Sequence, residues 1–228
     1  MLSRLPKWVW FGGAALAFAA GMVNAIAFLS FVHQAATHIT GIFTHLSLDI
    51  YSKNYAATLQ SGLALLFFFL GSVLSGILIK DAHLKMGRRY GAALFLECLL
   101  LVASTLAFQS KSILGECLAC MAAGLQNAMV STYSGTILRT THMTGVLTDL
   151  GALIGQSLGG IKIDKRKLEL LLGILLAFFW GGFWGAFAYT RMDYLAMLLP
   201  AGIVGISGFA YLALRKKTLA ALSQEQPF

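Results

Sequence analysis

The chain has 228 residues, of which 58% are hydrophobic and only 11% charged, and its formal net charge is +8. Soluble domains average roughly 25% charged residues, so this composition excludes an ordinary soluble fold. The excess of Lys and Arg could indicate a nucleic-acid partner. These residues stand, however, in short clusters between long apolar runs, as they do in the loops of membrane proteins. The expected partner is therefore the lipid bilayer, and no nucleic acid is expected.

Six apolar runs reach the length of about 20 residues that a helix needs to cross a bilayer. In chain order they are Trp8–Val32, Ala57–Ile79, Tyr90–Phe108, Ile113–Tyr133, Leu168–Tyr189 and Tyr194–Leu214. Two further segments, residues 37–50 and 141–158, follow the first and fourth runs and are too polar to be ordinary spans. These runs predict an all-α membrane protein of about six transmembrane helices.

The distribution of basic residues predicts the orientation of these spans. The N-terminus and every second loop after it together carry thirteen Lys and Arg residues, whereas the intervening loops carry three. Basic loops face the cytoplasm, so both termini of this multi-pass protein are expected there. This topology requires that residues 37–50 and 141–158 add no net crossing. Each is therefore expected to be a re-entrant stretch or part of a broken helix.

The two polar segments repeat each other. Residues 37–46 and 141–150 share the pattern T-H-φ-T-G-φ-φ-T-x-L, in which φ is apolar, at an offset of 104 residues. Upstream, GMVNA at residue 21 matches GLQNA at residue 124, and downstream FLGS at residue 69 resembles FWGG at residue 179. The chain is therefore predicted to contain two copies of one unit, residues 1–110 and 111–228.

Each predicted copy holds three passes, and an odd number forces the second copy to enter the membrane from the opposite face. Two copies related in this way form an inverted repeat. This architecture is common among secondary transporters, whose solute sites lie near the midplane where helices are interrupted. We therefore expect two inverted three-helix repeats, each with a broken or re-entrant T-H-x-T-G segment. Duplication for folding alone is the competing interpretation.

Thr40-Gly41 and Thr144-Gly145 are expected to begin short helices. The Thr side chain can cap the first free N–H groups, and Gly permits close approach of a backbone or a ligand. About ten residues of helix would follow Gly41, roughly 15 Å or half the hydrocarbon thickness. Helix N-termini attract anions, and Arg139 adds a full charge beside the second motif, so the pair suits an anion or a carboxylate group. Alternatively, these small residues only pack helices together.

Most of the histidines lie in or beside these segments. His38 and His142 occupy equivalent positions, where they could donate to a solute, carry a proton or simply cap a helix. His45 and Asp149 are also equivalent and are expected to form a proton-sensitive pair across the two copies. His45 and Asp49, at i and i+4, are too few ligands to predict a metal site. Neither a metal nor a cofactor is therefore expected.

Several polar side chains lie inside the apolar runs, where they must find partners. Asn24, Gln126 and Asn127 are expected either to line a cavity or to join the two copies by hydrogen bonds. Glu97 is a candidate proton carrier or the structural partner of a histidine or an arginine. Glu116 lies near the start of the fourth run and is expected to be solvated at the outer face.

At these residues the chain resembles the YoaK family of small bacterial inner-membrane proteins, a group of unknown function. The resemblance covers nearly the whole chain. It rests on the G-x-x-N-A segment at residue 21, T-G at residue 40, G-L-Q-N-A at residue 124 and T-T-H-M-T-G at residue 140. Many relatives carry Asp at the position of Asn24 and Asn at that of Ile42, so a family site that uses this acid would be absent here. The resemblance implies a multi-pass protein of the bacterial inner membrane with a duplicated core, and it supplies no substrate.

These patterns together predict a secondary transporter or exporter of a small solute, anionic if the helix ends bind it, with its site near the midplane. The predicted substrate-binding residues are Asn24, Thr37, His38, Thr40, Gly41, His45, Gln126, Asn127, Arg139, Thr141, His142, Thr144, Gly145 and Asp149, and the predicted proton-coupling residues are Glu97, His45 and Asp149. A channel-like pore and a structural or regulatory membrane protein are the alternatives. No hydrolase, metalloprotease or ATP-binding motif is present, so an enzyme is not expected. Helix faces made of small residues would also allow a homodimer.

Overall fold

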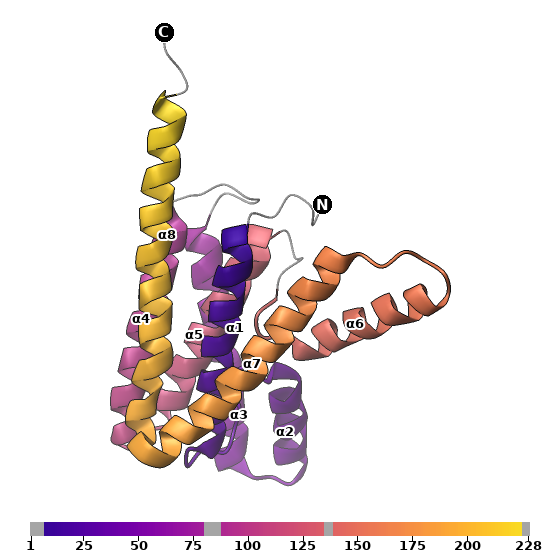
Figure 1. Ribbon diagram of the computed structural model, residues 1–228. Helices are drawn as coiled ribbons and strands as arrows, with labels where there is room; N and C mark the ends of the chain where they lie inside the picture. Colours follow the sequence, from indigo (N-terminus) through magenta and orange to yellow (C-terminus); the bar gives the residue numbers. More distant parts are fainter. Residues whose placement is uncertain (1–6, 80–87, 135–138, 225–228) are drawn as a thin grey trace.

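A computed structural model gives the fold of the chain and describes residues 7–79, 88–134 and 139–224 (Figure 1). These residues form helices and turns, without a strand. The helices are α1 (Lys7–Leu29), α2 (Ile39–Tyr51), α3 (Tyr55–Leu78), α4 (Arg88–Gln109), α5 (Leu114–Ser134), α6 (Met143–Leu158), α7 (Lys165–Met192), the 3₁₀ helix η2 (Asp193–Met197) and α8 (Leu198–Gln224). The six predicted apolar runs correspond to α1, α3, α4, α5, α7 and α8, and the two polar segments form α2 and α6.

Four helical segments within the described ranges are long and apolar enough to cross a membrane: Trp8–Leu29, Tyr55–Leu78, Arg89–Gln109 and Lys165–Lys216. The last segment contains both α7 and α8. Helix α5 is not among them, because Glu116, Gln126 and Asn127 lower its hydropathy. Large apolar side chains lie on the outer surface, where Phe69 is 63% and Phe209 68% exposed. Such a surface suits lipid, so these features are those of a helical membrane protein.

The helices of the bundle pack in pairs. Helix α1 lies along α7, α3 lies along α5, and α4 contacts both α5 and α8. At one end of the bundle α3 starts directly after α2, where the side chain of Asn54 accepts a hydrogen bond from the Ala57 N–H at 3.2 Å. In Figure 1, α1 begins and α8 ends at the same end of the bundle. The described part of the chain therefore begins and ends at the same end of the bundle.

Glycines allow α1 and α7 to approach closely. A Cβ atom on Gly21 would collide with the carbonyl oxygen of Phe178, and one on Gly181 would collide with the carbonyl oxygen of Phe18. Each helix thus offers a glycine to the backbone of the other. Small residues at such positions let two helix backbones come into contact, which strengthens van der Waals packing inside a membrane.

The α3–α5 pair has the same construction. A Cβ atom on Gly71 would collide with the carbonyl oxygen of Met121, and one on Gly124 with the carbonyl oxygen of Phe68. The Ser72 hydroxyl adds a hydrogen bond across this contact, donating to the carbonyl oxygen of Gly124 at 3.2 Å. Two helix pairs far apart in the sequence are therefore joined by the same reciprocal glycine contact.

Helices α2 and α6 lie beside the bundle. Helix α2 packs on α3, and α6 packs on α7. They have 13 and 16 residues, or roughly 20 and 24 Å at 1.5 Å per residue, less than the hydrocarbon thickness of roughly 30 Å. In Figure 1, both helices start next to the bundle, and α6 points away from it. Residues 37–50 and 141–158 therefore each contribute one short helix.

The glycine contacts predict a sharp difference between two substitutions on α7. Gly181→Ala places a methyl group against the Phe18 backbone and is expected to cost about 1–3 kcal/mol of unfolding free energy. Gly173→Ala is the matched control, because nothing lies within 4 Å of a Cβ atom there. Thermal unfolding of the purified protein in detergent measures both. Equal melting temperatures for the two variants would contradict the packing described.

Candidate functional site

Helices α2 and α6 begin in the same way. Their N-caps are His38, with φ −88° and ψ 58°, and His142, with φ −95° and ψ 66°. Neither helix has a side-chain cap, and the first helical bonds run from Ile42 N–H to His38 O and from Val146 N–H to His142 O. The predicted threonine cap is wrong, because the helices start one residue before the Thr of each motif. The N-cap side chains therefore leave N–H groups at the start of both helices unsatisfied.

Each imidazole lies against the glycine of its own motif. A Cβ atom on Gly41 would collide with Nδ1 of His38, and one on Gly145 would collide with Nδ1 of His142. Any larger residue would have to push the ring away from the first turn. Glycine in T-H-x-T-G thus allows the histidine ring to fold over the start of its helix.

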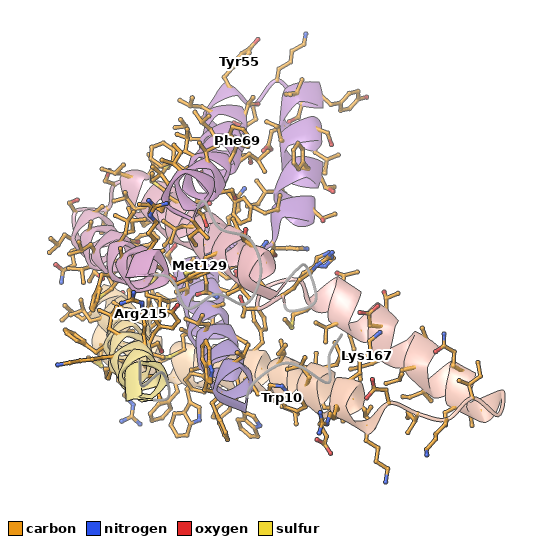
Figure 2. The ribbon with its side chains drawn as sticks, turned by 90° about the horizontal axis from the view of Figure 1, so that it is seen from above. Trp10, Tyr55, Phe69, Met129, Lys167 and Arg215 are labelled. Carbon is orange, nitrogen blue, oxygen red and sulfur yellow. The ribbon has the colours of Figure 1, made fainter. Side chains whose placement is uncertain are left out.

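The two helix starts meet at a cavity of about 340 Å³. Polar side chains of both motifs line it, together with side chains from α1, α3, α5 and α7. The lining residues are Asn24, Thr37, His38, Ile39, Thr40, Phe68, Asn127, Thr141, His142, Met143, Thr144 and Phe178. Figures 1 and 2 both show α2 and α6 starting close together and running apart. Segments 104 residues apart in the sequence therefore border one cavity.

The two asparagines of the cavity differ in their hydrogen bonds. Oδ1 of Asn24 accepts from the Thr37 N–H at 2.8 Å and from the Thr37 hydroxyl at 3.0 Å. Oδ1 of Asn127 is buried and has no hydrogen-bond partner among the described residues. Asn24 is thus used to hold the segment that precedes α2. Oδ1 of Asn127 can therefore still accept a hydrogen bond from another group.

Gln126 lies next to the cavity but does not line it. Its Nε2 donates to the carbonyl oxygen of Leu16 at 3.2 Å and to the Thr140 hydroxyl at 2.8 Å. The side chain therefore joins α5 to α1 and to the segment before α6. Of the two interpretations of this residue, the hydrogen bonds favour the one in which it holds parts of the chain together.

Arg139 contacts the cavity through His142. The guanidinium Nη1 lies 2.9 Å from Nδ1 of His142. Because arginine can only donate, Nδ1 accepts, and a neutral His142 then carries its proton on Nε2. The position equivalent to Arg139 in the first half is Ala35. Within the ranges that the structure describes, a cationic side chain therefore lies beside His142 but not beside His38.

The other predicted site residues lie outside the cavity lining. Gly41 and Gly145 stand behind the histidine rings. His45 and Asp149 are exposed, further along α2 and α6. Glu97 on α4 is 2% exposed, with no hydrogen-bond partner for Oε2 in the described ranges. The structure thus gathers Asn24, Asn127 and the threonines and histidines of both motifs, and leaves the predicted proton-coupling residues apart.

Glu116 differs from the sequence prediction. It was expected to be solvated, but it is 0% exposed. Helix α5 begins at Leu114 and packs at once against α4, where the Ser104 hydroxyl donates to the Gly115 carbonyl oxygen at 2.6 Å. The predicted solvation is wrong because the bundle already encloses the first turn of α5.

The sequence interpretation missed four apolar residues of the cavity: Ile39, Phe68, Met143 and Phe178. Phe68 and Phe178 precede Gly71 and Gly181 by three residues, one helical turn. This shared spacing was a usable signal, because the glycine contacts fix where the preceding turn lies. The phenylalanines add apolar surface to the lining of the cavity.

Among the residues that the structure describes, no group of three His, Cys, Asp or Glu side chains could hold a metal ion. A second cavity of about 360 Å³ lies between α1, α4, α5 and α8 and is lined almost entirely by apolar residues, among them Trp8, Leu94 and Met129. Such a lining offers few polar groups to orient a polar solute.

The hydrogen bonds of the two asparagines predict that replacement by leucine lowers stability more at residue 24 than at residue 127. Asn24→Leu leaves the Thr37 N–H without its acceptor and is expected to cost about 1–3 kcal/mol of stability. Asn127→Leu removes an unpartnered oxygen and is expected to cost less. Melting temperatures of the two variants in the same detergent test this order. A larger loss for Asn127→Leu would contradict the assigned hydrogen bonds.

Comparison with known proteins identifies a family. Residues 12–210 match the family described as "Protein of unknown function (DUF1275)". The match covers most of the chain, which therefore belongs to this family. It is the family to which the resemblance to YoaK proteins points. No curated protein and no solved structure matches the chain.

Proposed function

We propose that this member of the DUF1275 family is a secondary transporter or exporter of a small anionic solute, bound in the cavity between the N-termini of α2 and α6. The observation that carries the proposal is the meeting of two helix starts without side-chain caps at one polar cavity. Free N–H groups and the helix dipole favour an anion at such a place.

The side chains around the helix starts suit the same ligand. The two histidines can donate hydrogen bonds, the threonine hydroxyls can donate or accept, and Arg139 adds positive charge through His142. Asn127 can accept from a hydroxyl or an amine. The volume of about 340 Å³ is at the lower end of the range for small-molecule sites, roughly 300–1,000 Å³. The expected solute is therefore small.

We further propose that residues 1–110 and 111–228 form an inverted repeat. The reciprocal glycine contacts support it, since Gly21 and Gly181 join α1 to α7 as Gly124 and Gly71 join α5 to α3. The matching N-caps of α2 and α6 support it too. Inverted repeats in transporters place the solute at the interface of the two copies, where short helices present their N-termini.

The topology remains the one that the loops predict, with six passes and both termini in the cytoplasm. The pattern of basic loops and the common end at which α1 begins and α8 ends support it. Helix α5 then crosses the membrane inside the bundle, where Gln126 bonds to neighbouring segments and Asn127 lines the cavity. We also propose that the protein lies in the inner membrane and that it moves its solute without converting it chemically.

Flux into liposomes tests the proposed function. Purified protein is reconstituted and assayed for uptake of labelled formate, acetate and nitrate, and saturable uptake of at least one anion is expected. His38→Ala and His142→Ala each remove a donor from the cavity and should raise the half-saturation concentration about tenfold. His33→Asn is the control, because His33 is exposed outside the cavity at φ 53°, and asparagine tolerates this backbone conformation.

Two results would overturn the proposal. The first is the absence of saturable uptake for all three anions from protein that is folded in the liposomes. The second is a large unitary current in planar bilayers, which would favour a pore over a transporter. If His33→Asn and His142→Ala change the half-saturation concentration equally, the cavity histidines do not bind the solute.

A further inference from the structure

The cavity of about 360 Å³ between α1, α4, α5 and α8 is a groove with a buried floor and an open side. Leu16, Leu94 and Met129 form the floor, with exposures of 7, 6 and 3%. Phe11 and Ile206 also line the groove and are 77 and 70% exposed. The groove therefore opens to the outer surface of the bundle, where apolar side chains of this kind suit lipid.

Small residues of α1 leave the space for this groove. A Cβ atom on Gly12 would have nothing within 4 Å, and Gly13 and Ala15 line the same space. Helix α1 packs on α5 and α8, but within the described ranges it does not pack directly on α4. The groove lies in the gap that α1 and α4 leave between them.

The lining offers a ligand apolar surface over a length close to that of one membrane leaflet. None of the described lining residues is charged, and the Ser207 hydroxyl already donates to the carbonyl oxygen of Ile203 at 2.8 Å. The lining runs from Trp8 to Leu16 on α1 and from Ile206 to Leu214 on α8, or roughly 12 Å at 1.5 Å per residue. One leaflet holds roughly 15 Å of hydrocarbon. The groove therefore suits a lipid acyl chain.

Aromatic side chains stand at one end of the groove. The rings of Trp8 and Tyr211 are 5.8 Å apart, and those of Tyr90 and Tyr211 are 6.1 Å apart. All three line the groove, and Trp8 and Tyr90 belong to the first turns of α1 and α4. Trp and Tyr gather where a membrane meets water. In Figure 1 this is the end of the bundle where α1 begins and α8 ends, and it corresponds to the level of the lipid headgroups.

Basic residues follow directly beyond the aromatic end. Arg89 immediately precedes Tyr90 and is exposed. Leu214 is the last lining residue of α8, and Arg215 and Lys216 come next in the same helix. Lys216 is exposed as well. Positive charge therefore borders the groove at headgroup level.

Acidic groups are remote from this end. In the described ranges, the four helices that line the groove contain two acidic residues, Glu97 and Glu116. Glu97 lies seven residues beyond Tyr90 on α4, and Glu116 lies 13 residues before Met129 on α5. At 1.5 Å per residue these separations are roughly 10 and 20 Å. The charge at the end of the groove is thus complementary to a phosphate group.

We propose that the groove binds one anionic phospholipid of the surrounding bilayer, with an acyl chain between α1 and α8 and its phosphate beside Arg89 and Lys216. Basic pockets between transmembrane helices bind anionic headgroups in this way. The lipid contacts α1 and α4 from the first half of the chain and α5 and α8 from the second, so it joins the two halves. This site is separate from the proposed transport site and requires only that the bundle lies in a membrane.

Native mass spectrometry of the intact, delipidated protein in detergent tests the choice of ligand. Phosphatidylglycerol and phosphatidylcholine with identical chains are titrated separately. One phosphatidylglycerol should bind about tenfold more tightly than phosphatidylcholine, because basic side chains border its phosphate. Glycerol 3-phosphate, which has the phosphate but no acyl chain, should not displace it. Equal affinities for the two lipids, or displacement by glycerol 3-phosphate, would overturn the proposal.

Filling the groove tests where the lipid binds. Gly12→Leu should weaken phosphatidylglycerol binding about tenfold, as expected if two methylene groups lose their contacts. Gly202→Leu is the matched control, because a Cβ atom on Gly202 also has nothing within 4 Å and this residue lies on α8 outside the lining. Ala210→Leu, at an exposed position of the lining, is a second variant in case Gly12→Leu does not fold. Unchanged binding in the groove variants would refute the site.

Removing the charges tests the role of the headgroup. Arg89→Gln combined with Lys216→Gln should abolish the preference for phosphatidylglycerol and leave the affinity for phosphatidylcholine unchanged. Lys162→Gln combined with Lys165→Gln is the control, because these exposed residues lie at the start of α7, which Figures 1 and 2 show apart from the end of α8. An equal loss of preference in both double variants would contradict a specific headgroup site.

Two further outcomes separate this inference from others. A lipid-free dimer that dissociates in Gly12→Leu would assign the groove to a second copy of the chain and overturn the lipid site. Selective binding of phosphatidylglycerol by a protein that moves no anion in liposomes would support the lipid site, while the proposed transport would fail.

Discussion

The contact of helix backbones at Gly21, Gly71, Gly124 and Gly181 is the constraint on which the rest of the structure depends. It fixes α1 against α7 and α3 against α5 at distances that no other residue allows. One turn beyond Gly21 and Gly124 stand the two asparagines of the cavity, and one turn before Gly71 and Gly181 stand its two phenylalanines. The position of the cavity therefore follows from the helix contacts.

The two halves share a backbone and differ in their polar groups. The N-caps of α2 and α6 have nearly the same dihedral angles. Among the described residues, however, Arg139 lies beside His142 only, and its equivalent in the first half is Ala35. The features that the two halves share are thus those that packing requires. The difference at Arg139 places positive charge beside one of the two motifs.

The apolar runs predicted the helices, and the repeated motif identified His38 and His142 as equivalent positions, because periodicity and internal repetition can be read directly from the sequence. The helix cap at Thr40 was predicted wrongly, since the boundary differs by one residue, a detail that local preferences do not fix. The burial of Glu116 and the bonds of Gln126 depend on which helices become neighbours. No local pattern in one sequence contains that information.

Cross-linking across the cavity tests the central claim most directly. A variant with Cys98, Cys117 and Cys120 replaced by Ser carries either Thr40→Cys with Thr144→Cys, or Thr44→Cys with Thr148→Cys one turn further out. Because α2 and α6 diverge from the cavity, a short bifunctional maleimide should join the first pair within one chain and leave the second pair unjoined. Equal cross-linking of both pairs, or none of the first, would contradict a shared cavity.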